Sequence, residues 1–132
     1  MTDIWLRGIL SIVSLESFGK KRKDDLNMAI LHPDKSEFDA LVKEEGVLFV
    51  DFFADWCGPC KMLAPEMEKL AAEFEGKAKV VKINVDQHQD LAAEFRVQSI
   101  PALYVIKNGK IVSQDLGYKP YPALQSMLYR VI

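Results

Sequence analysis

Cysteine is nearly absent from this chain, which has two, Cys57 and Cys60, among 132 residues. Small secreted domains held together by disulfides are much richer in cysteine, so that class of protein is excluded. A closed zinc site needs about four ligands, and His32 and His88 do not stand at ligand spacing from the pair or from each other, so we expect no metal. A single pair in a domain of this size is more typical of a reactive dithiol than of a structural disulfide.

Charge of one sign is not in excess, and no apolar run is long enough to cross a bilayer. Lys and Arg number 17 against 19 Asp and Glu, which gives a net charge of −2 and no electrostatic case for nucleic acid as a partner. The 49% hydrophobic content and the length are those of one globular domain that can bury a core. Residues 4–15 are mostly apolar, but about 20 such residues are needed to span a membrane.

The first 26 residues form an amphipathic segment followed by a basic cluster at 20–23. This start does not resemble a secretory signal, because it begins with Asp3 and the basic cluster disfavours export of the residues after it. We favour a helix docked on the domain or a frayed tail. The second hypothesis is reversible contact of residues 4–23 with an anionic membrane surface. We therefore divide the chain into an N-terminal extension, 1–26, and one domain, 27–132.

Strands and helices alternate along residues 27–132. We expect Ser36 to cap the first helix, and the helix after the cysteines to carry Pro65 inside it and Met62 in its apolar stripe. A near-continuous apolar run at 47–54 predicts a central strand covered on both faces, and Asn108-Gly109 predicts a hairpin. This order predicts an α/β fold in which a mixed sheet is flanked by helices on both faces. The expected strands are 27–31, 47–54, 80–85, 102–106 and 111–114. A short helix is expected at 90–95, and a closing helix is expected to bury Leu124, Met127, Leu128 and Val131.

The chemistry concentrates at residues 56–60, Trp-Cys-Gly-Pro-Cys, between the central strand and a helix. The unpaired N–H groups and the dipole at a helix start stabilise a thiolate, which is the attacking form of cysteine. Gly58 and Pro59 suit a tight first turn. We expect Cys57 to be the more exposed nucleophile and Cys60, one turn further in, to resolve the mixed disulfide with the substrate.

Asp51 lies in the middle of the apolar strand, where an unpaired charge is costly. We expect a buried acid with a raised pKa that exchanges a proton with Cys60 through water. Lys82 on the neighbouring strand either pairs with Asp51 or is an edge lysine with a packed stem.

Four segments, 50–65, 82–86, 100–102 and 107–110, closely resemble the thioredoxin family, and the resemblance extends over residues 27–132. It implies a thioredoxin fold, the proton-relay role of Asp51 and a cis Ile100–Pro101 bond that faces the disulfide. The chain departs from the family pattern at Phe53, where most members have tryptophan, and at Ser99, Ala102 and Tyr118. An apolar collar for the protein substrate is implied at Trp56, Gly58, Pro59, Ile100 and Gly117.

The resemblance implies a cytoplasmic oxidoreductase that reduces protein disulfides and takes part in electron transport and cell redox homeostasis. It implies no bound cofactor, because electrons come from NADPH through a thioredoxin reductase, and we expect a monomer. Two alternatives stay open. The first is an exported or membrane-attached protein of the same kind, and the second is a protein-binding module whose redox chemistry is incidental.

Overall fold

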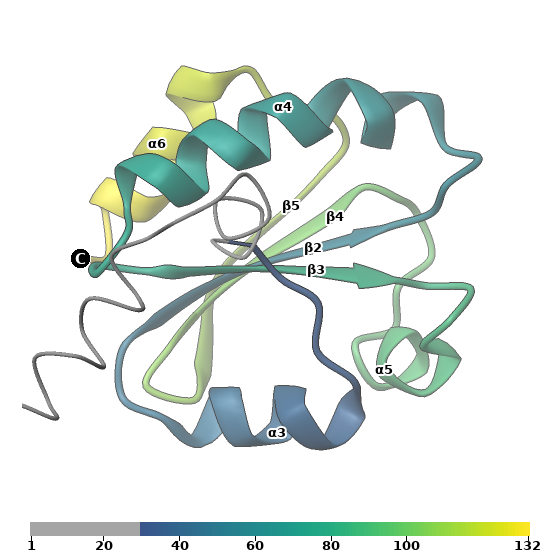
Figure 1. Cartoon of the computed structure of the whole chain (residues 1–132), viewed down its shortest axis with the longest axis horizontal. Helices are drawn as coiled ribbons and strands as arrows, with labels where there is room; N and C mark the ends of the chain where they lie inside the picture. Colours follow the sequence, from purple (N-terminus) through teal and green to yellow (C-terminus); the bar gives the residue numbers. More distant parts are fainter. Residues whose placement is uncertain (1–29) are drawn as a thin grey trace, which may run out of the picture.

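The structure is a computed structural model, and it describes residues 30–132 (Figure 1). Within these residues the strands form one mixed sheet in the order β1-β3-β2-β4-β5. β1, β3 and β2 run parallel, and β4 is antiparallel to both β2 and β5. The strands are β1 (Ile30–Leu31), β2 (Val47–Phe53), β3 (Lys79–Asn84), β4 (Ala102–Lys107) and β5 (Lys110–Leu116). The helices are α3 (Lys35–Lys43), α4 (Gly58–Glu73), α5 (Gln89–Glu94) and α6 (Tyr121–Tyr129).

Helices cover both faces of the sheet, as the alternating pattern predicts. Figure 1 shows α4 and α6 on one face and α3 and α5 on the other. β2 lies at the centre and is apolar on both sides, because successive side chains of a strand point to opposite faces. Phe49 packs with Leu63 of α4, while Phe52 packs in a second core with Phe38 of α3. The central strand thus carries its next residues directly to the start of α4.

Two local predictions are wrong. Asp34, not Ser36, caps α3: its side chain accepts a hydrogen bond from the Glu37 backbone N–H at 2.8 Å, and Glu37 accepts one from the Asp34 N–H at 3.0 Å. This reciprocal capping box satisfies two amides that Ser36, already inside the first turn, cannot reach. Met62 does not belong to the buried stripe of α4, since 62% of its surface is exposed near the start of the helix.

The hairpin prediction is confirmed. Asn108 and Gly109 both have positive φ, 50° and 83°, which is the conformation of a two-residue turn whose twist matches the strands. The strand expected at 27–31 is present at 30–31, and its first three positions lie outside the described residues. The amphipathic extension 1–26 also lies outside them, so its role stays a prediction.

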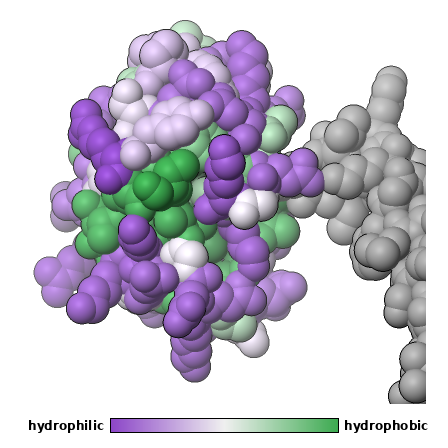
Figure 2. All heavy atoms as spheres, turned by 90° about the vertical axis from the view of Figure 1, so that its left-hand side faces the viewer, coloured by the Kyte–Doolittle hydropathy of each residue, from purple (hydrophilic) through white to green (hydrophobic). Residues whose placement is uncertain are grey.

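The end of the molecule opposite the cysteines carries mixed apolar and polar side chains. Figure 2 views this end and shows an apolar patch enclosed by hydrophilic residues. A hollow of about 220 Å³ lies between α3, the start of β2 and the turn after α4, and its rim includes the Lys79–Glu44 ion pair. In the part of the chain that the structure describes, no helix is both long and apolar enough to span a membrane.

Candidate active site

The cysteine motif lies between the end of β2 and the start of α4. β2 ends at Phe53, a turn follows, and α4 begins at Gly58 with proline in its first turn. Cys57 is the N-cap residue, and its Sγ accepts a hydrogen bond from the Cys60 backbone N–H at 3.2 Å. A negative charge on this sulfur is stabilised by the amide and by the helix dipole.

Cys57 and Cys60 form a disulfide, with their Cα atoms 5.2 Å apart. They lie in a small apolar cluster with Ala54, against which Phe53, Val85 and Ile100 pack. The two cysteines differ little in burial, with 5% and 3% of their surface exposed. Cys57 is the more exposed of the two, as expected, but only slightly, because the cluster that contains it is packed against Phe53, Val85 and Ile100. What distinguishes Cys57 is its position at the helix cap.

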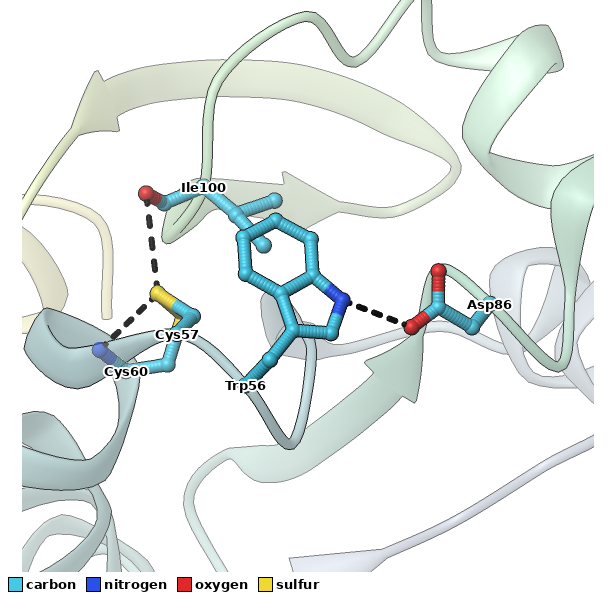
Figure 3. Close-up of a disulfide and its surroundings, with 5 residues drawn as sticks. All are labelled: Trp56, Cys57, Cys60, Asp86 and Ile100. Atoms are coloured by element: carbon cyan, nitrogen blue, oxygen red, sulfur yellow. Dashed lines mark hydrogen bonds between the residues drawn. A yellow bond between two sulfur atoms is a disulfide. The ribbon is translucent and has the colours of Figure 1, made fainter.

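The loop before β4 lies over the disulfide. The Ile100–Pro101 peptide bond is cis, which confirms the expectation from the resemblance. The Ile100 carbonyl oxygen lies 3.9 Å from the Sγ of Cys57, where it can accept a hydrogen bond from the thiol of the reduced protein (Figure 3). Gly117 donates from its N–H to the carbonyl of Pro101 at 2.8 Å. The structure thus brings Ile100, Pro101 and Gly117 to the redox pair.

Trp56 projects beside the disulfide with 70% of its surface exposed, and a residue that the sequence analysis missed holds it there. Its indole Nε1–H donates to the Oδ2 of Asp86 at 2.9 Å (Figure 3). Asp86 follows β3, and its own N–H donates to the Asn84 side chain at 2.9 Å. The signal available in the sequence was a polar pair at the end of a strand parallel to β2. With Gly58 and Pro59 also exposed, an apolar rim surrounds the sulfurs.

Asp51 is fully buried within β2, where its cross-strand partner on β4 is Leu103. Among the described residues, neither carboxyl oxygen has a hydrogen-bond partner. Burial raises the pKa of Asp51 to about 7, and the positive charge of Lys82 offsets part of that rise. A carboxyl with this pKa can both take up and release a proton near neutrality.

Lys82 lies on the neighbouring strand β3, as expected, and is the register partner of Asp51. Within residues 30–132, however, no ion pair or hydrogen bond joins the two side chains. The Lys82 Nζ lies instead 4.3 Å from the centre of the Phe53 ring. Lys82 therefore acts on Asp51 through its charge alone.

A family model described as Thioredoxin matches residues 29–130, which is most of the chain. The chain belongs to the thioredoxin family. It is 48% identical over 101 residues to the thioredoxins of Staphylococcus aureus strains Mu50 and MW2, covering 76% of this chain and 96% of each relative. Its structure resembles that of a thioredoxin variant from Halobacterium salinarum NRC-1, with a TM-score of 0.71, 35% identity, and coverage of 76% of this chain and 88% of the other.

As a thioredoxin, the protein is an oxidoreductase that reduces protein disulfides by dithiol–disulfide exchange at Cys57 and Cys60. Thioredoxins bind no cofactor, because the redox couple is part of the chain. The members of this family work with a thioredoxin reductase and with disulfide-containing substrates. Within residues 30–132, no cluster of His, Cys, Asp and Glu has the composition of a metal site.

Proposed function

We propose that Cys57 attacks the substrate disulfide, that Cys60 resolves the mixed disulfide, and that Asp51 relays the proton of Cys60. The observation that carries the assignment is the hydrogen bond from the Cys60 N–H to the Sγ of Cys57 at the cap of α4. This bond and the dipole favour the thiolate at Cys57. Cys60 lies within the first turn, and its backbone N–H donates to Cys57 rather than to its own sulfur.

The two exchange steps balance without a cofactor. The Cys57 thiolate attacks one substrate sulfur, the substrate S–S bond breaks, and the other substrate sulfur leaves as a thiolate that takes up a proton. Asp51, as the carboxylate, accepts the proton of the Cys60 thiol. The Cys60 thiolate then attacks the Sγ of Cys57, the mixed disulfide breaks, and the reduced substrate leaves. Two electrons have passed from the dithiol to the substrate.

The collar supports recognition of an extended substrate segment. The backbone of Ile100 lies beside Cys57, and the rim formed by Trp56, Gly58, Pro59 and Gly117 is apolar and carries no charge of its own. An extended peptide can align its backbone with Ile100 while its cystine reaches Cys57. The substrates that fit are proteins with an accessible disulfide in an extended or locally unfolded segment.

We infer that a thioredoxin reductase regenerates the dithiol with electrons from NADPH, and that the protein acts as a monomer in the cytoplasm. The low cysteine content supports a reducing compartment, where a lone pair of this kind is a working redox couple. The family match over residues 29–130 supports placing this activity in the domain of residues 27–132. Fractionation of cells, with sequencing of the N-terminus from each fraction, tests the location and the fate of residues 1–26.

Trapping experiments test the order of the cysteines. Cys60→Ser should accumulate a mixed disulfide with a model protein disulfide such as insulin, because nothing resolves it. The matched variant Cys57→Ser should accumulate none, since its remaining sulfur lies inside the turn. The adducts are counted by non-reducing electrophoresis and mass spectrometry. Equal trapping by both variants would contradict the assignment, and failure of the unaltered protein to reduce insulin would contradict the function.

A further inference from the structure

Phe53, Lys82 and Asp51 meet on the face of the sheet that α4 covers. Phe53 comes two residues after Asp51 on β2, so both side chains point to the same face. Lys82 stands opposite Asp51 on β3, yet its Nζ lies over the Phe53 ring, 4.3 Å from the centroid. The carboxyl of Asp51 meanwhile keeps both oxygens unpartnered among the residues that the structure describes.

This arrangement calls for a physical reason, because a buried carboxyl beside a cation usually forms an ion pair. A hydrogen bond from the Lys82 ammonium would satisfy one of the Asp51 oxygens and would keep the carboxyl ionised. The face of an aromatic ring attracts an ammonium group as well, and that attraction strengthens where water is excluded. The Phe53 ring is half-buried and thus competes with Asp51 for the Lys82 ammonium.

Building on the proton relay proposed above, we propose that Phe53 is a positioning residue for the redox reaction. Its ring holds the Lys82 ammonium near Asp51 but out of an ion pair, so that the buried carboxyl stays free to exchange a proton with Cys60. Phe53 also packs against the cluster that contains Cys57 and Cys60, so one side chain lies between the surroundings of the redox pair and the lysine.

Among the groups around Asp51, Lys82 is the one whose position decides whether the carboxyl forms an ion pair. β4 contributes Leu103, which is apolar, and Lys82 is the one charged group among the described residues that shifts the pKa of Asp51. His32 follows β1 and lies near enough to Lys82 to feel its charge. Partial burial first, and then the charge of Lys82, lower the pKa of His32, which favours its neutral form. The raised pKa of Asp51, about 7, agrees with a carboxyl that has no ion-pair partner.

Direct titration of Asp51 tests the role of the ring. The oxidised protein is used, since its cysteines do not titrate, and the Asp51 carboxyl is followed by ¹³C NMR or by its infrared band. Phe53→Leu and Phe53→Met remove the ring face but keep an apolar side chain. Each should lower the pKa of Asp51 by about one unit or more, because Lys82 is then free to pair with it. Phe53→Trp should leave the pKa near its original value.

A double-mutant cycle separates an effect through Lys82 from a change in packing. Lys82→Met should raise the pKa of Asp51, and adding Phe53→Leu to Lys82→Met should then have no further lowering effect. A pKa that does not fall in either ring-free variant would overturn the proposal, and so would a fall that persists without Lys82. Near-UV circular dichroism checks that each variant is folded. If Phe53→Leu does not fold, Phe53→Met replaces it in the cycle.

This test is independent of the proposed function. The titration reads Asp51 without turnover, so a protein that failed to reduce insulin would defeat the proton relay and still report on the ring. In a working enzyme, the acid limb of the pH–rate profile should move to lower pH in Phe53→Leu, with Phe53→Trp restoring it. A profile that stays in place while the titration moves would show that Asp51 is not the relay.

Discussion

Replacing Asp51 by asparagine should stabilise the oxidised protein, and the gain should grow with pH. The pKa of Asp51 is raised by burial from an ordinary 3.8 to about 7. The folded protein therefore holds this proton more tightly than the unfolded chain does. Below about pH 4 both states are protonated, so the ionisation of this group costs no stability. Between about pH 4 and 7 the unfolded chain alone has lost the proton, so stability falls as the pH rises.

The magnitude comes from linkage. A difference of about three pH units, at about 1.4 kcal/mol per unit, corresponds to about 4 kcal/mol lost between pH 4 and pH 7 and no further loss above it. Asparagine has no such titration, and any penalty for burying its amide is the same at every pH. The difference in unfolding free energy between Asp51→Asn and the original protein should therefore increase by roughly that amount and then level off.

Urea unfolding of the oxidised proteins at pH 4.5, 5.5, 6.5 and 8 measures this difference. Glu68→Gln is the matched control, since it removes an exposed carboxyl from α4 and should show no comparable trend. A stability difference that stays constant from pH 4.5 to 8 would refute the reasoning, because Asp51 would then titrate alike in both states. In the reduced protein, the same variant should slow resolution at Cys60 and leave the first attack by Cys57 intact.

Three further predictions concern single contacts. Asp34→Ala should lower the unfolding free energy by about 1 kcal/mol in urea titrations by opening the capping box of α3, whereas an equal loss in Ser36→Ala would contradict that assignment. Leu128→Ala should lower the unfolding free energy by about 3 kcal/mol in the same assay, because this residue of α6 is fully buried. The folded variant should reduce insulin at the original rate, and a lower rate would contradict this prediction. Asp86→Ala should release the Trp56 indole and raise the KM for a protein disulfide about fivefold with little change in kcat, and an unchanged KM would contradict a positioning role.

Local patterns predicted most of the fold. The apolar run at 47–54 indicated a doubly covered central strand, and β2 lies at the centre of the sheet. Asn108-Gly109 predicted the hairpin because few residues accept two successive positive φ angles. The cap of α3 was misplaced because Asp34 and Ser36 are both good capping residues, and only the backbone path decides which side chain reaches the free amides.

The sequence likewise predicted some features of the candidate site and missed others. Cys57 and Cys60 are neighbours in sequence, so spacing alone indicated their chemistry. Asp86 was missed because its partner, Trp56, is 30 residues away and the contact exists only once β3 lies beside β2. The similar burial of the two cysteines was missed for the same reason, since the loop before β4 covers them from a distance of about 40 residues along the chain.

The sequence by itself determined the redox pair, the helix start that stabilises a thiolate, and the alternation of strands and helices, because each depends on residues a few positions apart. Only the tertiary structure decided which groups surround that pair. It buried Asp51 without a partner, turned Lys82 toward the Phe53 ring, and set the Ile100 carbonyl beside Cys57. These contacts join strands and loops that are distant in the chain, and their energies depend on the distances between side chains, which no local pattern specifies.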